Sequence, residues 1–317
     1  MGRRVINELY SQEYEHPFDK RALDALEQTP GLETLVRKFN QYWNDKVLKI
    51  QYTGSNIKVT DRNFPGIYDA LKEACRILNV PKLPDLYIQW SYDINAFTAG
   101  VESPIIVLNT GTIDLLTYEE ILFIIGHELG HIKSQHVLYN QMAQVLPVLG
   151  NIVGSATLGI GSLISTGLQI AILNWSRMSE FTADRAGILA CQDVNSAVSA
   201  MVKIAGVPQK YFDSINIDDF IQQAKEFESY DYDSLDKMAK IISIMWQNHP
   251  WTVMRAAEFF KWIDSGQYDN ILNRNNHNNH MTVNPKPMFC SECGNKLRGN
   301  ERFCTKCDKC FDAGYSS

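Results

Sequence analysis

The sequence of 317 residues lacks several features that would assign it to a class at once. Its formal charge is −6 and it has no long basic run, so its charge does not indicate nucleic-acid binding. The N-terminal residues 1–4 lead into polar sequence rather than into the apolar core of a signal peptide. Only two of the seven cysteines precede residue 290, which excludes a disulfide scaffold for most of the chain. We therefore expect a cytoplasmic globular protein.

A second shortage is local, because residues 134–176 contain no Asp, Glu, Lys or Arg. The stretch is longer than a membrane span, so membrane contact through 137–173, at the inner face of the membrane, has to be considered. Polar residues interrupt it throughout, however, Pro147 breaks it early, and charged or Trp anchors are sparse at its ends. We favour buried or lid-forming helices joined by a glycine-rich turn, and membrane contact stays open.

The clearest functional signal present is the pentapeptide His127-Glu128-Leu129-Gly130-His131. On a helix, residues four apart lie on one face, so both imidazoles can reach one metal ion with Glu128 beside its open coordination position. Thr117 and Glu120 have the spacing of a capping box, which marks the start of this helix. His136 would lie off the metal face of the same helix, so we expect a structural role for it. The motif predicts a zinc hydrolase without saying of which kind.

A catalytic zinc needs a third protein ligand besides His127 and His131. The motif that continues to a third histidine is excluded, because Ser134 and Val137 stand at its Gly and His positions. A carboxylate from a later helix is the alternative, and Glu180 is the best candidate. The expected site therefore holds one catalytic Zn²⁺ on two histidines and one glutamate.

Glu180 lies within the charged cluster Arg177-x-x-Glu180-x-x-Ala183-Asp184. On a helix, Glu180 and Asp184 share a face, and Arg177 lies one turn earlier on the same side. Asp184 would then accept the second ring N–H of a ligand histidine and fix its tautomer. A surface charge cluster has the same spacing, so the residues alone leave both interpretations open.

The chemistry that such a site performs is hydrolysis by an activated water. Zinc acidifies the water and polarises the scissile carbonyl, while Glu128 takes the proton and later delivers it to the leaving amine. His249, which precedes Pro250, could donate to the developing oxyanion, or it could simply cap a helix. The sequence physics by itself favours the helix cap.

Three short β-type runs, 86–90, 95–99 and 105–108, precede the metal helix and predict a small sheet beside it. If one edge of this sheet is exposed, it can bind an extended peptide as an additional strand. A sheet without a free edge is the equal alternative. Upstream, we expect helices at 19–26, 31–39 and 64–78, and a β-hairpin over 46–60 around the turn 52–55.

The C-terminal region carries a second metal signature. Two C-x-x-C pairs ten residues apart can close a tetrahedral, structural Zn²⁺ site, formed by Cys290, Cys293, Cys304 and Cys307. The arrangement resembles a zinc ribbon, although Asp308 replaces the expected Gly and Cys310 adds a thiol that we expect to be free. We expect this ribbon to recruit a protein partner, and we expect no nucleic acid.

Four motifs in this order resemble the gluzincin metallopeptidases related to HtpX and the CAAX prenyl endopeptidase, and the resemblance covers residues 64–262. The motifs are Asn95-Ala96-Phe97, His127-Glu128-x-x-His131, Arg177-x-x-Glu180-x-x-Ala183-Asp184, and His249-Pro250 with Arg255. The chain is more similar to the soluble branch of this family, since it has no N-terminal membrane spans. That resemblance favours the lid interpretation of residues 134–176.

The resemblance also implies roles for individual residues. The two motif histidines and the glutamate of the third motif would ligate zinc, and Glu128 would be the catalytic base. Asp184 would hydrogen-bond to a ligand histidine and hold its ring, and residues 95–97 would lie on the strand that binds the substrate main chain. His249 and Arg255 would border the site and help to stabilise the transition state.

The expected fold is α+β and mostly helical: a zincin-like metallopeptidase domain with a small sheet beside the metal helix, and a small C-terminal zinc ribbon. We expect an N-terminal helical segment and hairpin over 1–60, the peptidase domain over 61–265, a flexible linker over 266–288 and the ribbon over 289–311. The leading function is a zinc metalloendopeptidase that acts on polypeptides. A membrane-associated quality-control protease and a catalytically idle adaptor are the alternatives, and the intact Glu128 argues against the adaptor.

Overall fold

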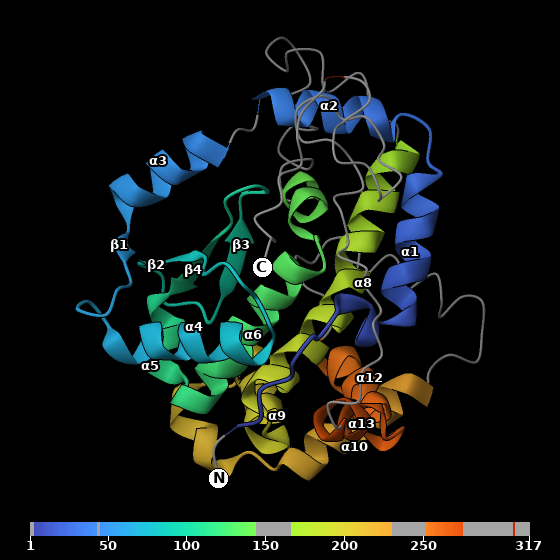
Figure 1. Cartoon of the computed structure of the whole chain (residues 1–317). Helices are drawn as coiled ribbons and strands as arrows, with labels where there is room; N and C mark the ends of the chain where they lie inside the picture. Colours follow the sequence, from blue (N-terminus) through green and yellow to red (C-terminus); the bar gives the residue numbers. More distant parts are fainter. Residues whose placement is uncertain (1–2, 43–44, 144–165, 230–251, 275–306, 308–317) are drawn as a thin grey trace.

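The structure is a computed structural model that describes residues 3–42, 45–143, 166–229, 252–274 and 307. It is α+β and mostly helical, with one four-stranded sheet, as the sequence predicts (Figure 1). The predicted helices near 19–26, 31–39 and 64–78 are confirmed as α1 (Pro17–Glu27), α2 (Leu32–Tyr42) and α4 (Pro65–Ile77).

The sheet confirms the three predicted strands and adds a short fourth one. Its strands are β1 (Ile57–Lys58), β2 (Asp85–Gln89), β3 (Ala96–Ala99) and β4 (Ile105–Asn109), in the order β1-β2-β4-β3. β4 pairs in parallel with β2 and antiparallel with β3, and all five of its residues are buried. Burial on both faces of the sheet explains why β4 carries a continuous run of apolar residues. Within the described residues, β3 is therefore an edge strand.

Helices cover both faces of the sheet. α3 (Asp45–Ser55) contributes Leu48 to a small core on one face. α4 and α6 (Tyr118–Lys133) pack against the other face, where Ile106 and Leu108 of β4 enter the main hydrophobic core. Because α6 carries the metal-binding motif, the sheet and the motif share one core.

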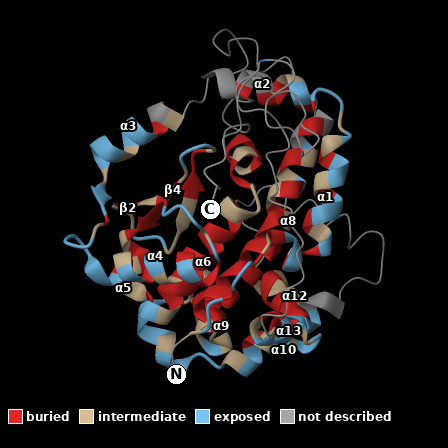
Figure 2. Ribbon diagram, viewed as in Figure 1, coloured by how far each residue is buried: buried red, intermediate tan, exposed pale blue. Residues whose placement is uncertain are grey.

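The centre of the molecule is the contact between α6 and α8 (Thr166–Cys191), which Figure 2 shows as the most buried part of the chain. α6 begins at the predicted capping box, in which Thr117 and Glu120 bond to each other's backbone N–H. The two helices approach closely because Gly126 and Gly130 lie at the contact. A Cβ at Gly130 would come within 2.6 Å of the Ala186 Cβ.

The remaining helices surround this pair. α1 runs along α8, α9 (Val194–Ile204) packs against α6 and α8, and α12 (Thr252–Asp264) packs against α8 and α9 (Figure 1). The other helical segments are η1 (Ser11–Glu13), α5 (Thr110–Leu115), η2 (Gln209–Ser214), α10 (Ile217–Ser229) and α13 (Gln267–Asn273).

The predicted β-hairpin over 46–60 is wrong. The segment forms α3 and the two-residue strand β1. Leu48 and Tyr52 are one helical turn apart and both contact the sheet, so the helical period decides the structure. The carboxylate of Asp45 accepts three backbone N–H bonds from residues 101–103, at 2.7 to 3.0 Å, and this fixes the start of α3.

The predicted linker over 266–288 begins too early, because α13 occupies residues 267–273 and buries Tyr268 and Ile271 in the main core. Ile6, Leu9 and Tyr14 belong to the same core, so the N-terminal segment packs onto the domain that contains α6 and α8. Residues 275–288, most of the uncharged stretch (144–165) and most of the ribbon lie outside the described residues. Among the described helices, we find none that meets the requirements for a membrane span.

The close helix contact gives a test of the fold. In Gly126→Ala the new Cβ would come within 2.4 Å of the Ala190 Cβ, so we expect the free energy of unfolding to fall by about 1–3 kcal/mol. Gly66→Ala on α4 is the control, since no atom lies within 4 Å of its added Cβ and alanine favours helix by up to about 1 kcal/mol. Urea unfolding of the metal-free protein measures both, and equal midpoints would contradict the packing described.

Candidate metal centre

Two histidines from α6 and one glutamate from α8 meet in the protein interior. The Nε2 atoms of His127 and His131 are 3.2 Å apart. The Glu180 carboxylate places one oxygen 3.4 Å from the His127 Nε2 and the other 3.3 Å from the His131 Nε2. All three residues are buried, and within the described part of the chain no other group of His, Cys, Asp or Glu has metal-binding geometry.

The donor set and its spacing fit zinc. Two imidazole nitrogens and a carboxylate oxygen are a usual ligand set for a catalytic zinc with one open position. Bonds of about 2.0–2.1 Å in tetrahedral geometry place ligand atoms roughly 3.3 Å apart, close to the 3.2 Å between the two Nε2 atoms, and each Nε2 faces a different oxygen of the Glu180 carboxylate at a similar distance. The three side chains could therefore hold one metal ion.

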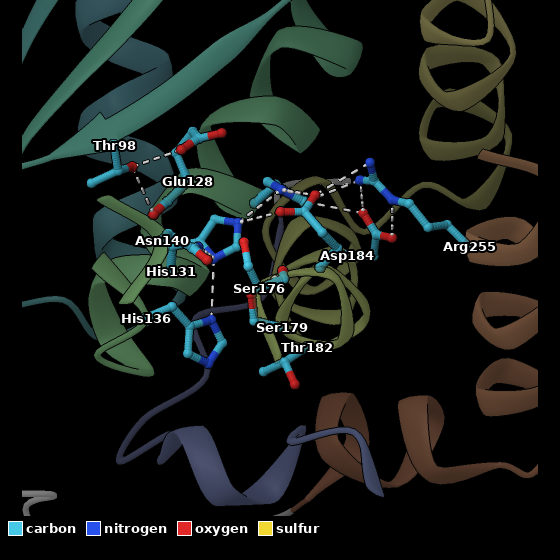
Figure 3. A network of polar contacts seen from close by, with 12 residues as sticks. Thr98, Glu128, His131, His136, Asn140, Ser176, Ser179, Thr182, Asp184 and Arg255 are labelled. Carbon is cyan, nitrogen blue, oxygen red and sulfur yellow. Dashed lines mark hydrogen bonds and ion pairs between the residues drawn. The ribbon is translucent and has the colours of Figure 1, made fainter. Parts of the chain in front are cut away.

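Asp184 and Arg255 lie on the side of this centre opposite Glu128, as Figure 3 shows. Asp184 Oδ1 lies 3.0 Å from the Nδ1 of His127, and the Nε of Arg255 donates to Asp184 Oδ2 at 2.8 Å. Arg255 also lies 3.4 Å from a Glu180 oxygen. Because Asp184 accepts the Nδ1–H of His127, the neutral form of this ring has its lone pair on Nε2, the atom that would face a metal ion.

The charges explain why a cation is favoured here. Burial would raise the pKa of Asp184, but the Arg255 guanidinium and the His127 ring together outweigh burial and hold this pKa below its usual range. Burial would lower the pKa of His127, yet its hydrogen bonds to Asp184 and Glu180 raise it to about 10. Among the described residues, the Glu180, Asp184 and Glu128 carboxylates outnumber the two cationic groups beside them, the Arg255 guanidinium and the protonated His127 ring, which leaves one negative charge in excess.

Glu128 has a partner that the sequence did not reveal. The hydroxyl of Thr98 on β3 donates to Glu128 Oε2 at 2.6 Å, and it lies 3.3 Å from the Glu128 backbone oxygen (Figure 3). Both residues are buried. The alternation along β3 places Thr98 on the face that meets α6, and this is the one signal that could have identified it.

The predicted substrate strand lies next to the metal helix. Asn95 precedes β3. Its backbone N–H donates to the Thr112 hydroxyl at 2.8 Å, and this hydroxyl donates to the Asn95 backbone oxygen at 2.7 Å. Ala96 and Phe97 open the strand, and the Phe97 ring packs on Tyr52 on the face away from α6. One edge of β3 pairs with β4, and no described strand pairs with the other.

The other predicted site residues divide into two groups. Arg177 is buried on α8, one turn before Glu180, and burial lowers the pKa of its guanidinium. His249, Cys290, Cys293, Cys304 and Cys310 lie outside the described residues. Cys307 is exposed, and the structural zinc site and the oxyanion donor stay predictions.

Comparison with known proteins agrees with this geometry. The sequence profile of peptidase family M48 matches residues 62–263. A plastoglobule-localized metallopeptidase 48, chloroplastic, from Arabidopsis thaliana is 30% identical over 275 residues, which are 86% of this chain and 78% of that protein. A protease HtpX homolog from Ralstonia nicotianae is 27% identical over 205 residues, 56% of this chain and 70% of the relative. No solved structure matches the chain significantly.

The buried pair of Arg255 and Asp184 can be tested without any metal. Arg255→Met leaves the Asp184 carboxylate buried without its cation, so we expect a loss of about 3–5 kcal/mol in the free energy of unfolding with chelator present. Lys261→Met removes an exposed ion pair with Glu258 on the same helix, and it should cost at most about 1 kcal/mol. Similar costs for both variants would show that Arg255 does not hold the site together.

Proposed function

The chain belongs to peptidase family M48, and we propose on that basis that it is a zinc-dependent endopeptidase. The observation that carries the proposal is the convergence of His127, His131 and Glu180 within the same buried centre. These three side chains would bind the catalytic zinc. Bound zinc would act as a Lewis acid that polarises the scissile carbonyl and acidifies the attacking water.

Glu128 is the proposed general base. It lies between the two ligand histidines in the sequence, and its Oε2 accepts a hydrogen bond from Thr98. That bond fixes the carboxylate and leaves its second oxygen available to the attacking water. Glu128 would take the proton from this water and deliver it to the leaving amine.

The edge of β3 that pairs with no described strand is the proposed substrate-binding edge. An extended peptide can add to such an edge through main-chain hydrogen bonds, which bind it without regard to sequence. Thr98 lies on this strand and contacts Glu128, so a peptide on β3 passes next to the base. Residues Asn95, Ala96 and Phe97 would contact the substrate main chain beyond it.

The structure supports a different role for Arg255 from the one that the family resemblance implies. Its guanidinium is buried and bonds to both oxygens of Asp184. We therefore assign to it the positioning of Asp184 and Glu180 rather than contact with the transition state. His249 remains the proposed donor to the oxyanion.

Several further parts of the proposal rest on sequence alone. They are the structural Zn²⁺ on four cysteines, a protein partner for the ribbon, and a cytoplasmic location. The name of the Arabidopsis relative places that protein at plastoglobules. For this chain, a peripheral location at a membrane remains an alternative to free diffusion in the cytoplasm.

Replacing the base tests the function directly. We expect Glu128→Gln to lower cleavage of a casein substrate by about 10²–10⁴-fold, since it removes general-base catalysis while both ligand histidines remain. Bound zinc should not change. Glu119→Gln in the first turn of the same helix is the matched control and should keep wild-type activity. If wild type and Glu128→Gln degrade casein equally, the chain is not a peptidase of this mechanism.

A further inference from the structure

The two ligand histidines are supported in different ways. His127 contacts a carboxylate directly, through Asp184. The Nδ1 of His131 instead lies 3.1 Å from the Nδ1 of a third histidine, His136. The Nε2 of His136 in turn lies 3.1 Å from an oxygen of Asp19, so a carboxylate again ends the chain of contacts.

Only one arrangement of protons makes this chain compatible with a metal ion. If the Nε2 of His131 faces the metal, its Nδ1 must carry the hydrogen. His131 then donates to the Nδ1 of His136, which must be unprotonated, so the hydrogen of His136 is on Nε2 and is donated to Asp19. Each bond has one donor and one acceptor. The carboxylate thereby selects the metal-binding tautomer of His131 through two imidazoles.

Asp19 is firmly held in this position. It lies in the first turn of α1 with 1% of its surface exposed, and its Oδ2 also accepts the hydroxyl of Thr182 at 2.6 Å. Thr182 itself accepts the backbone N–H of His16 at 3.0 Å. Thr182 lies on α8 between Glu180 and Asp184, so one hydroxyl ties α1 to the helix that provides the glutamate.

A nearby amide offers the only other polar contact to the same nitrogen among the described residues. The Nδ2 of Asn140 lies 3.3 Å from the Nδ1 of His131. An N–H group cannot donate to a nitrogen that already carries its hydrogen, so Asn140 could serve only with its amide turned to present the oxygen. The contact to His136 is shorter, and its unprotonated Nδ1 can accept the hydrogen on the Nδ1 of His131 without any change of side-chain orientation.

We propose that Asp19 and His136 are positioning residues of the metal centre, which hold the His131 ring with its Nε2 directed at the metal. This inference rests on the proposed binding of zinc by His127, His131 and Glu180. Asp19 precedes the region that matches the family profile, residues 62–263. The N-terminal helix α1 thus contributes a positioning residue, Asp19, to the zinc site.

The competing explanation is that Asp19 and His136 only join α1 to the core. Zinc affinity separates the two, because a purely structural contact changes the stability of the metal-free protein but not the affinity of the folded site. We would measure zinc affinity of the full chain by competition with a chromophoric chelator. Zinc that remains in Glu180→Ala belongs to other sites and is subtracted.

Two pairs of variants make the test specific. His136→Phe keeps a ring against Trp175 but cannot accept the Nδ1–H of His131, whereas His136→Gln provides an acceptor oxygen. Asp19→Ala removes the terminal carboxylate, whereas Asp19→Asn keeps an oxygen for His136 and Thr182. The control is Asp24→Ala, which removes an exposed carboxylate from the same helix. Urea midpoints of the metal-free variants report structural damage separately.

We expect His136→Phe and Asp19→Ala to weaken zinc binding by about 10–100-fold. His136→Gln and Asp19→Asn should recover part of this loss, and Asp24→Ala should bind as the wild type does. If Asp19→Ala does not fold, the two His136 variants decide. Wild-type affinity in folded His136→Phe would overturn the positioning role and leave the proposed function intact. If the wild type loses no zinc on Glu180→Ala, both proposals are wrong.

Discussion

The close contact between α6 and α8 sets the geometry of the metal centre and of the core around it. Gly126 and Gly130 remove two side chains at the point where the helices meet, and small residues of α8 fill the space. This brings the two histidines of α6 within 3.3–3.4 Å of Glu180. The same contact buries the groups, so their charges interact strongly. Packing and chemistry are thus set by one interface.

Burial makes the centre costly unless its charges are compensated. Three carboxylates, Glu128, Glu180 and Asp184, lie in the interior with the guanidinium of Arg255: Glu128 accepts from Thr98, Asp184 accepts from Arg255, and Glu180 forms an ion pair with Arg255. Burying a charge without a partner costs roughly several kcal/mol, and a bound divalent cation would offset this cost. Metal binding is therefore expected to stabilise the fold as well as to create the catalytic centre.

The sequence predicted the parts of this centre that follow from local spacing. The structure confirms three such predictions: α6 begins at the capping box at Thr117, this helix carries the two histidines four residues apart, and strands form within 86–108. The hairpin at 46–60 failed because two apolar residues one turn apart also satisfy a helix, and only contact with the sheet decides between them. Local pattern could not supply that contact.

The support of His131 was missed for a different reason. On a continuous helix His136 points away from the metal, but α6 ends at Lys133 and Gln135 adopts a left-handed conformation with a φ of 60°. The chain therefore turns, the His136 backbone N–H donates to the His131 carbonyl at 2.9 Å, and the two rings meet. Asp19 is more than a hundred residues away in the sequence, so no spacing rule links it to the site.

We infer that His127, His131 and Glu180 hold one zinc ion. Anomalous diffraction at the zinc absorption edge, from crystals of the full chain, would locate this ion. We expect a peak about 2.0–2.2 Å from the Nε2 atoms of both histidines and from one oxygen of Glu180. A zinc-loaded crystal with no peak at this position, or with the ion held by other side chains, would contradict it.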